Sequence, residues 1–105
     1  MNKDNIQKGD SGDKPPVIKP STRQNKRFMA TFSNGKTVHF GLKNGETYID
    51  HNNKQKRENY LKRHIKNEDW NNPYSAGALS KFLLWGDYTT LEKNYNYFMK
   101  KFNNP

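Results

Sequence analysis

The residues whose types suit acid–base or metal chemistry are three histidines and a few carboxylates in the middle of the chain. These candidates are His39, His51, His64, Asp50, Glu68 and Asp69. Histidine–metal nucleases need a hairpin-to-helix arrangement of such ligands, and the spacing here does not supply it. A turn and a helix cap account for Asp50 and His51, and His64 suits the border of a helix's apolar stripe. We therefore expect no enzymatic activity, no cofactor and no metal site.

Other kinds of chemistry are excluded by residues that the sequence lacks. There is no cysteine, which excludes disulfides, a thiol nucleophile and a Cys-ligated zinc. No Gly-rich phosphate loop or nucleophile elbow is present. A chain of 105 residues without an apolar run of about 20 residues predicts one soluble domain with no membrane contact.

Positive charge is the most prominent property of the sequence, and it is concentrated in one segment. The chain carries 19 Lys and Arg against 10 Asp and Glu, a net charge of +9. Residues 54–66 hold six cations against Glu58 alone, which is +5 of that total. The six cations are Lys54, Lys56, Arg57, Lys62, Arg63 and Lys66. A dense basic segment is typical of a polyanion-binding surface, and the alternative is a solvated helix face.

The type of cation indicates what the segment would contact. Lysine greatly outnumbers arginine, which favours contact with the phosphate backbone over bidentate reading of base edges. Lys36, in a predicted turn, is a further candidate contact. Trp70 follows two acids, Glu68 and Asp69, in a polar loop. It either anchors that loop on the core while one of the acids pairs with Arg63, or offers an exposed platform on which a base stacks.

The elements that would position these residues begin after a polar tail. Residues 1–26 contain few large apolar groups and several helix and strand breakers, namely Gly9, Gly12, Pro15, Pro16 and Pro20. We predict a disordered basic tail over 1–26 and a single α+β module over 27–105. The tail is either a plain terminus or a basic arm that orders on a polyanion or a neighbouring subunit.

A hairpin is predicted at the start of the module. Asn34-Gly35 lies between two β-rich runs, which is a strong signal for a two-residue loop. That loop would place Phe32 opposite Thr37 and Ala30 opposite His39. Both faces would then be partly apolar, which predicts cover on both sides or a further strand. Tyr48-Ile49 is the candidate third strand.

Three helices are predicted to follow the hairpin. The first spans 53–66, with Tyr60, Leu61, His64 and Ile65 forming its apolar stripe. The second spans 76–84, with a Ser75 cap and Gly86 as a left-handed stop. Thr89 and Glu92 form a predicted capping box for the third, whose stripe is Leu91, Tyr95, Phe98 and Phe102. The predicted fold is thus α+β, a β-hairpin packed against about three helices.

Several short motifs of the module resemble those of a known protein family. They include Phe32-Ser33-Asn34-Gly35-Lys36, Thr47-Tyr48-Ile49-Asp50-His51, Arg63-His64, Glu68-Asp69-Trp70, Ala76-Gly77, Leu79-Ser80, Leu84-Trp85-Gly86 and Asn94. With these motifs, residues 27–102 resemble a family of small uncharacterised proteins encoded by nucleocytoplasmic large DNA viruses of amoebae and algae. The resemblance implies a viral source and leaves the mechanism open.

The charge and the resemblance together predict a function. We expect a virus-encoded, non-enzymatic protein that binds nucleic acid without sequence preference, with DNA as the partner, and that condenses or packages the genome. The expected locations are the virion and, during infection, the host cytoplasm or viral factory. The alternative is a minor capsid or inner-shell protein that contacts other virion proteins.

Overall fold

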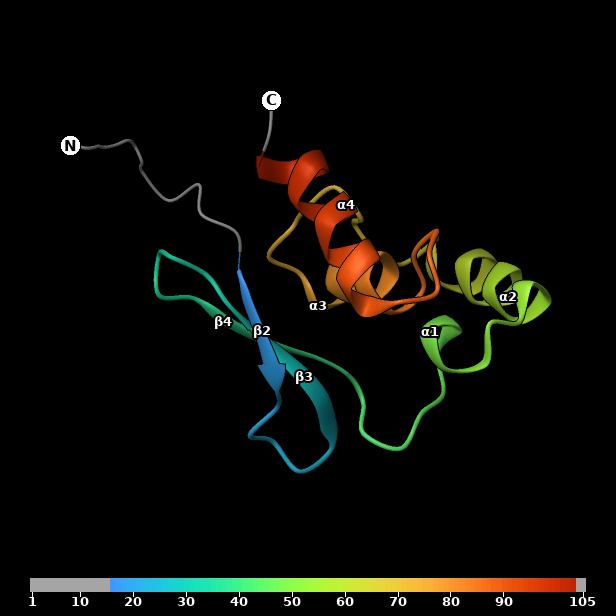
Figure 1. The fold of residues 1–105 in the computed structure, drawn as a ribbon, viewed down its shortest axis with the longest axis horizontal. Helices are drawn as coiled ribbons and strands as arrows, with labels where there is room; N and C mark the ends of the chain where they lie inside the picture. The colour runs from blue at the N-terminus through green and yellow to red at the C-terminus, as the bar shows by residue number, and fades with distance from the viewer. Residues whose placement is uncertain (1–15, 104–105) are drawn as a thin grey trace.

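The structure is a computed structural model that describes residues 16–103, and its fold is α+β, as predicted (Figure 1). Three antiparallel strands in the order β2-β3-β4 are followed by helices. The elements are β2 (Val17–Pro20), β3 (Lys26–Thr31), β4 (Thr37–Leu42), α1 (Tyr48–His51), α2 (Lys54–His64), α3 (Ala76–Leu79), the π-helical turn η2 (Ser80–Leu84) and α4 (Leu91–Asn103). The predicted tail residues 1–15 lie outside the described residues.

The predicted hairpin is present, but its register is one position away from the prediction. Thr31 pairs with Thr37 and Phe28 with Phe40, so the loop is Ser33-Asn34-Gly35 rather than Asn34-Gly35 alone. Gly35 adopts a φ of 91°, the left-handed conformation that ends three-residue hairpin loops. The slip matters because it places Phe28 and Phe40 on the same face of the sheet.

Strand β2 corrects the predicted boundary of the tail. Val17 pairs with Thr31 and Ile18 with Ala30, so these residues belong to the module. The carbonyl of Pro16, which is fully buried, accepts a 2.7 Å hydrogen bond from the Tyr95 hydroxyl of α4. A four-residue edge strand flanked by prolines has too little periodicity to be predicted locally, and it forms because β3 offers a free edge.

The two faces of the sheet have different environments. Ala30, Phe32 and Phe40 are buried in the core cluster, and Phe28 and Val38 pack against it. On the opposite face Val17 is 53% exposed, and Ser21 Oγ lies 2.8 Å from His39 Nδ1. Within residues 16–103, helices cover one face of the sheet, and of the two predicted alternatives, cover on both sides or a further strand, the structure has the further strand, β2.

The predicted third strand at Tyr48-Ile49 is instead the short helix α1. Thr47 begins it with a capping box, in which the Asp50 carboxylate accepts from the Thr47 backbone N–H at 2.8 Å. Asp50 also accepts two hydrogen bonds from the Arg27 guanidinium of β3, at 2.7 and 2.8 Å. The Arg27 guanidinium holds the pKa of the Asp50 carboxyl well below its usual range, and hydrogen bonds from Thr47 act in the same direction.

The C-terminal helices form the main core with the sheet. Ser75 caps α3 as predicted, and the stripe of α4 contributes Phe98, which is almost completely buried. The cap of α4 is Thr90, whose side chain accepts from the Lys93 N–H, rather than Thr89. Gly86 is not left-handed; it is required because a Cβ there would lie 2.3 Å from the Phe82 carbonyl oxygen.

Helix α2 lies at the edge of this core, at the end of the molecule opposite the hairpin loop (Figure 1). Asn53 caps it by accepting from the Lys56 N–H at 3.1 Å. Tyr60 is its buried residue, whereas Ile65, predicted in the apolar stripe, is 59% exposed. Within residues 16–103, no helix is both long and apolar enough to cross a membrane.

Candidate nucleic-acid interface

The exposed side of α2 and the turn after it carries most of the predicted contact cations. Five of the six basic side chains are exposed: Lys54, Lys56, Lys62, Arg63 and Lys66. None of these five forms an ion pair with another residue of the described part of the chain. We call these five residues the α2 basic face. Their charges are available to a polyanion because no carboxylate within residues 16–103 forms an ion pair with them.

Arg57 has a different environment from the other five cations. It is half-buried, its Nε donates to the Trp85 carbonyl at 3.0 Å, and its Nη2 lies 2.6 Å from the Asp87 carboxylate. Its side chain thus attaches α2 to the segment that follows η2. The sequence predicts Arg57 as a phosphate contact, whereas in the structure its guanidinium is bonded to Trp85 and Asp87.

Lys36 and Trp70 lie away from the α2 basic face. Lys36 is at the hairpin loop, at the far end of the molecule from α2, with its ammonium 5.5 Å from the Tyr74 ring centre (Figure 1). Trp70 is half-buried against the core, and its indole N–H donates to Glu68 at 2.8 Å. This geometry matches the interpretation of Trp70 as an anchor rather than an exposed platform.

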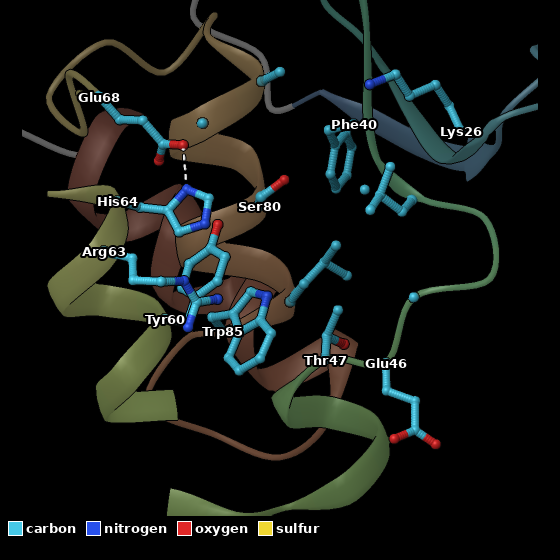
Figure 2. A pocket seen from close by; sticks show the side chains of 16 residues that line it. Lys26, Phe40, Glu46, Thr47, Tyr60, Arg63, His64, Glu68, Ser80 and Trp85 are labelled. Carbon is cyan, nitrogen blue, oxygen red and sulfur yellow. Dashed lines mark hydrogen bonds and ion pairs between the residues drawn. The ribbon is translucent and has the colours of Figure 1, made fainter. Parts of the chain in front are cut away.

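A cleft of about 390 Å³ lies beside the α2 basic face (Figure 2). One side is formed by the end of β4 and the 45–47 segment, and the other by α2, α3 and η2. A second hollow of about 290 Å³ includes Lys56 and Asn59, and it shares Glu46, Arg63 and Trp85 with the cleft. The cleft is therefore continuous with part of the α2 basic face.

Three aromatic rings are stacked along the α2 side of the cleft. The Tyr60 ring lies 4.2 Å from that of Trp85 at an interplanar angle of 4°, and 4.1 Å from the imidazole of His64 at 24°. Helical spacing of four places Tyr60 and His64 on the same side of α2. The Trp85 ring reaches the stack from the end of η2. The stack was not predicted, because Trp85 is distant in sequence.

His64 is held by a chain of hydrogen bonds that leads to Trp70. His64 Nδ1 lies 2.6 Å from one Glu68 oxygen, and the Trp70 indole N–H donates to the other. Glu68 thus pairs with His64 rather than with Arg63, the partner that the sequence predicts for one of the two acids. Gly77 leaves room for this carboxylate, because a Cβ there would lie 2.9 Å from Glu68 Cδ. The imidazole is consequently fixed at the cleft wall.

The hydroxyl of Tyr60 also faces the cleft (Figure 2). Burial raises the pKa of the Tyr60 hydroxyl, and the charge of Glu68 adds to the rise while that of Arg63 opposes it. The group is therefore protonated at physiological pH and is a hydrogen-bond donor.

The remaining chemical candidates do not converge. His39 lies on the outer face of the sheet beside Ser21, and His51 Nδ1 accepts from the Asn53 N–H at 2.9 Å at the end of α1. The Asp69 carboxylate accepts from the Asn71 N–H within its own loop. Among residues 16–103, no group of three or more His, Cys, Asp or Glu side chains is placed to hold a metal ion.

Part of the chain is similar to a known protein family. A family of unknown function (DUF5754) matches residues 17–64, which extend from β2 to the end of α2. This stretch contributes the β4 side and the α2 side of the cleft. No curated protein and no solved structure matches the chain.

Proposed function

We propose that this protein is a non-enzymatic nucleic-acid-binding protein that contacts the phosphate backbone without sequence preference through the α2 basic face. The observation that carries the proposal is the exposure of five cations on and just after one helix that has a single acidic residue, Glu58. Lysine ammonium groups on flexible stems contact phosphates as point charges, so little base discrimination is expected.

The biological setting belongs to the same proposal. The resemblance of the module to proteins of large DNA viruses supports a viral source, with the protein packaged in virions and DNA as its partner. Condensation or packaging of the genome suits a small basic protein whose binding is electrostatic.

Fluorescence anisotropy with random-sequence DNA, measured over a range of salt concentrations, tests the binding. The variant Lys56→Gln/Lys62→Gln/Lys66→Gln removes three charges of the α2 basic face. It is compared with Lys36→Gln/Lys93→Gln/Lys100→Gln, which removes the same charge from the hairpin loop and α4. We expect the α2 variant to reduce the slope of log K against log salt by about 2 to 3, and the control by less than about 1.

Two results would contradict the proposal. One is the absence of binding at low salt by the wild-type protein, and the other is equal loss in the two triple variants. Cross-linking mass spectrometry on purified particles then addresses the structural alternative. Links to capsid subunits without any link to DNA would favour a minor capsid or inner-shell protein.

A further inference from the structure

The cleft beside the α2 basic face has the size and the lining of a ligand site. Its volume of about 390 Å³ falls in the range of small-molecule sites, roughly 300–1,000 Å³. We infer that this cleft receives one unpaired nucleobase of a single-stranded nucleic acid. The inference rests on the proposed function, because the strand is held by the same cations.

One wall of the cleft presents polar ring edges. Figure 2 shows the Tyr60 hydroxyl and the Trp85 indole nitrogen on the cleft side of the aromatic stack, and Ser80 also lines the cleft. The indole N–H donates, the hydroxyls donate and accept, and the fixed imidazole of His64 adds a further ring nitrogen. A nucleobase edge, which alternates donors and acceptors, is suited to such a wall.

The rest of the lining is largely apolar. Phe40, Leu42 and Leu84 contribute carbon surface from β4 and η2. A planar base buries its faces against such surface while its edge is hydrogen-bonded. Sugar and phosphate groups are more strongly hydrated, and they would remain outside.

The charges of the lining favour a neutral group over a phosphate. Lys26 and Arg63 are balanced by Glu46 and Glu68, and Glu68 is already bonded to His64 and Trp70. A phosphate in the cleft would face two carboxylates, whereas a neutral base would not be repelled. Phosphates are better placed on the α2 basic face outside.

The arrangement of the two hollows connects the base to the backbone. Glu46, Arg63 and Trp85 line both the cleft and the hollow that contains Lys56. A strand with phosphates at Lys56 and Arg63 therefore passes the mouth of the cleft, where one base can turn inward. A base paired within a duplex cannot do so without being extruded, so single strands are preferred.

The experiment compares three ligands of equal length by fluorescence anisotropy: a mixed-sequence DNA single strand, an abasic strand with the same phosphates, and a duplex. We expect the wild-type protein to bind the base-bearing single strand about 10-fold more tightly than the abasic strand. Circular dichroism melts establish that each variant is folded.

Two variants address the cleft without removing the aromatic stack. Ala76→Leu adds bulk at an exposed lining residue that begins α3, and Thr89→Leu is the control outside the cleft. Ala76→Leu should abolish the preference for bases and leave abasic-strand binding unchanged. Tyr60→Phe, which keeps the stacked ring, should weaken binding of the base-bearing strand about threefold.

The outcomes separate this inference from the proposed function. Equal wild-type affinity for the base-bearing and abasic strands, or a preference that persists in Ala76→Leu, would overturn the nucleobase site while leaving backbone binding intact. Binding of none of the three ligands would overturn both.

Discussion

Helices α2 and α4 have similar lengths and both carry aromatic residues, yet the structure uses them differently. Helix α4 inserts Asn94 and Phe98 into the interior, where both are almost completely buried. Helix α2 buries only Tyr60 and directs its cations, except Arg57, outward. The comparison teaches that the buried contacts and the exposed cations are carried by different helices. Substitutions in α4 should reduce stability, and those on the outer side of α2 should reduce binding.

The largest effect is expected from the aromatic core of α4. Phe98→Ala should lower the free energy of unfolding by about 4 kcal/mol, because it removes a buried ring and leaves a cavity. Ile65→Ala, at the exposed turn after α2, should cost less than about 0.5 kcal/mol. Urea denaturation followed by circular dichroism measures both. Similar losses of unfolding free energy in the two variants would show that the stabilising contacts are not concentrated in α4.

A pair of asparagines compares the two helices at a polar position. Asn94 donates to the Leu83 and Tyr88 carbonyls at 3.1 and 2.9 Å and accepts from the Tyr88 N–H at 3.0 Å. Asn94→Leu should cost about 3 kcal/mol, since it leaves these groups without partners. Asn59→Leu on the exposed side of α2 should change stability by less than about 0.5 kcal/mol. Thermal melts of both variants would test this, and an intact melting temperature in Asn94→Leu would contradict it.

Two arginines of α2, the half-buried Arg57 and the exposed Arg63, allow stability and binding to be compared within one helix. Arg57→Gln should reduce stability by about 1 kcal/mol, because Arg57 holds the Trp85 carbonyl and Asp87. Arg63→Gln should leave stability nearly unchanged and weaken DNA binding. Denaturation and anisotropy on the two variants should therefore give opposite orders of effect. If Arg57→Gln had the larger effect on both stability and binding, Arg57 would also contact the nucleic acid.

The smallest effect is expected from the ion pair that attaches α1 to the sheet. Because the folded-state pKa of Asp50 is lowered, its contribution is present above the unfolded-state pKa and is lost as the pH falls through the acid range below about 5. Asp50→Asn should be less stable than wild type at pH 7, by under about 1 kcal/mol for this partly exposed pair. Melts from pH 7 to pH 2 should show that difference narrowing as the pH falls below the unfolded-state pKa, and a difference that is the same at pH 7 and pH 2 would assign it to another cause.

The elements that could be predicted from the sequence are those with strong local signals. The hairpin follows from Asn34-Gly35, the start of α3 from the Ser75 cap, and the inner side of α4 from its aromatic spacing. Each depends on residues only a few positions apart. Thr47 and Asp50 also form a local signal, a capping box, which favours the helix α1 over the predicted strand.

Other errors and omissions concern contacts between distant residues. β2 forms only because β3 has an edge to pair with, and the hairpin register is set by which side chains reach the core. The cleft escaped prediction because its walls come from four separate segments. His64 and Trp85, for example, are brought to the two ends of one stack by Tyr60.

The sequence by itself determined the α+β class, the positions of the principal helices and the concentration of charge in residues 54–66, because propensity, capping and charge are properties of short stretches. Only the tertiary structure decided which of those cations are exposed, since exposure depends on what packs beside α2. It turned Arg57 inward, separated Lys36 from the α2 basic face and placed Trp70 against the core. It also formed the cleft, because it stacked Tyr60 on Trp85 across from the end of β4.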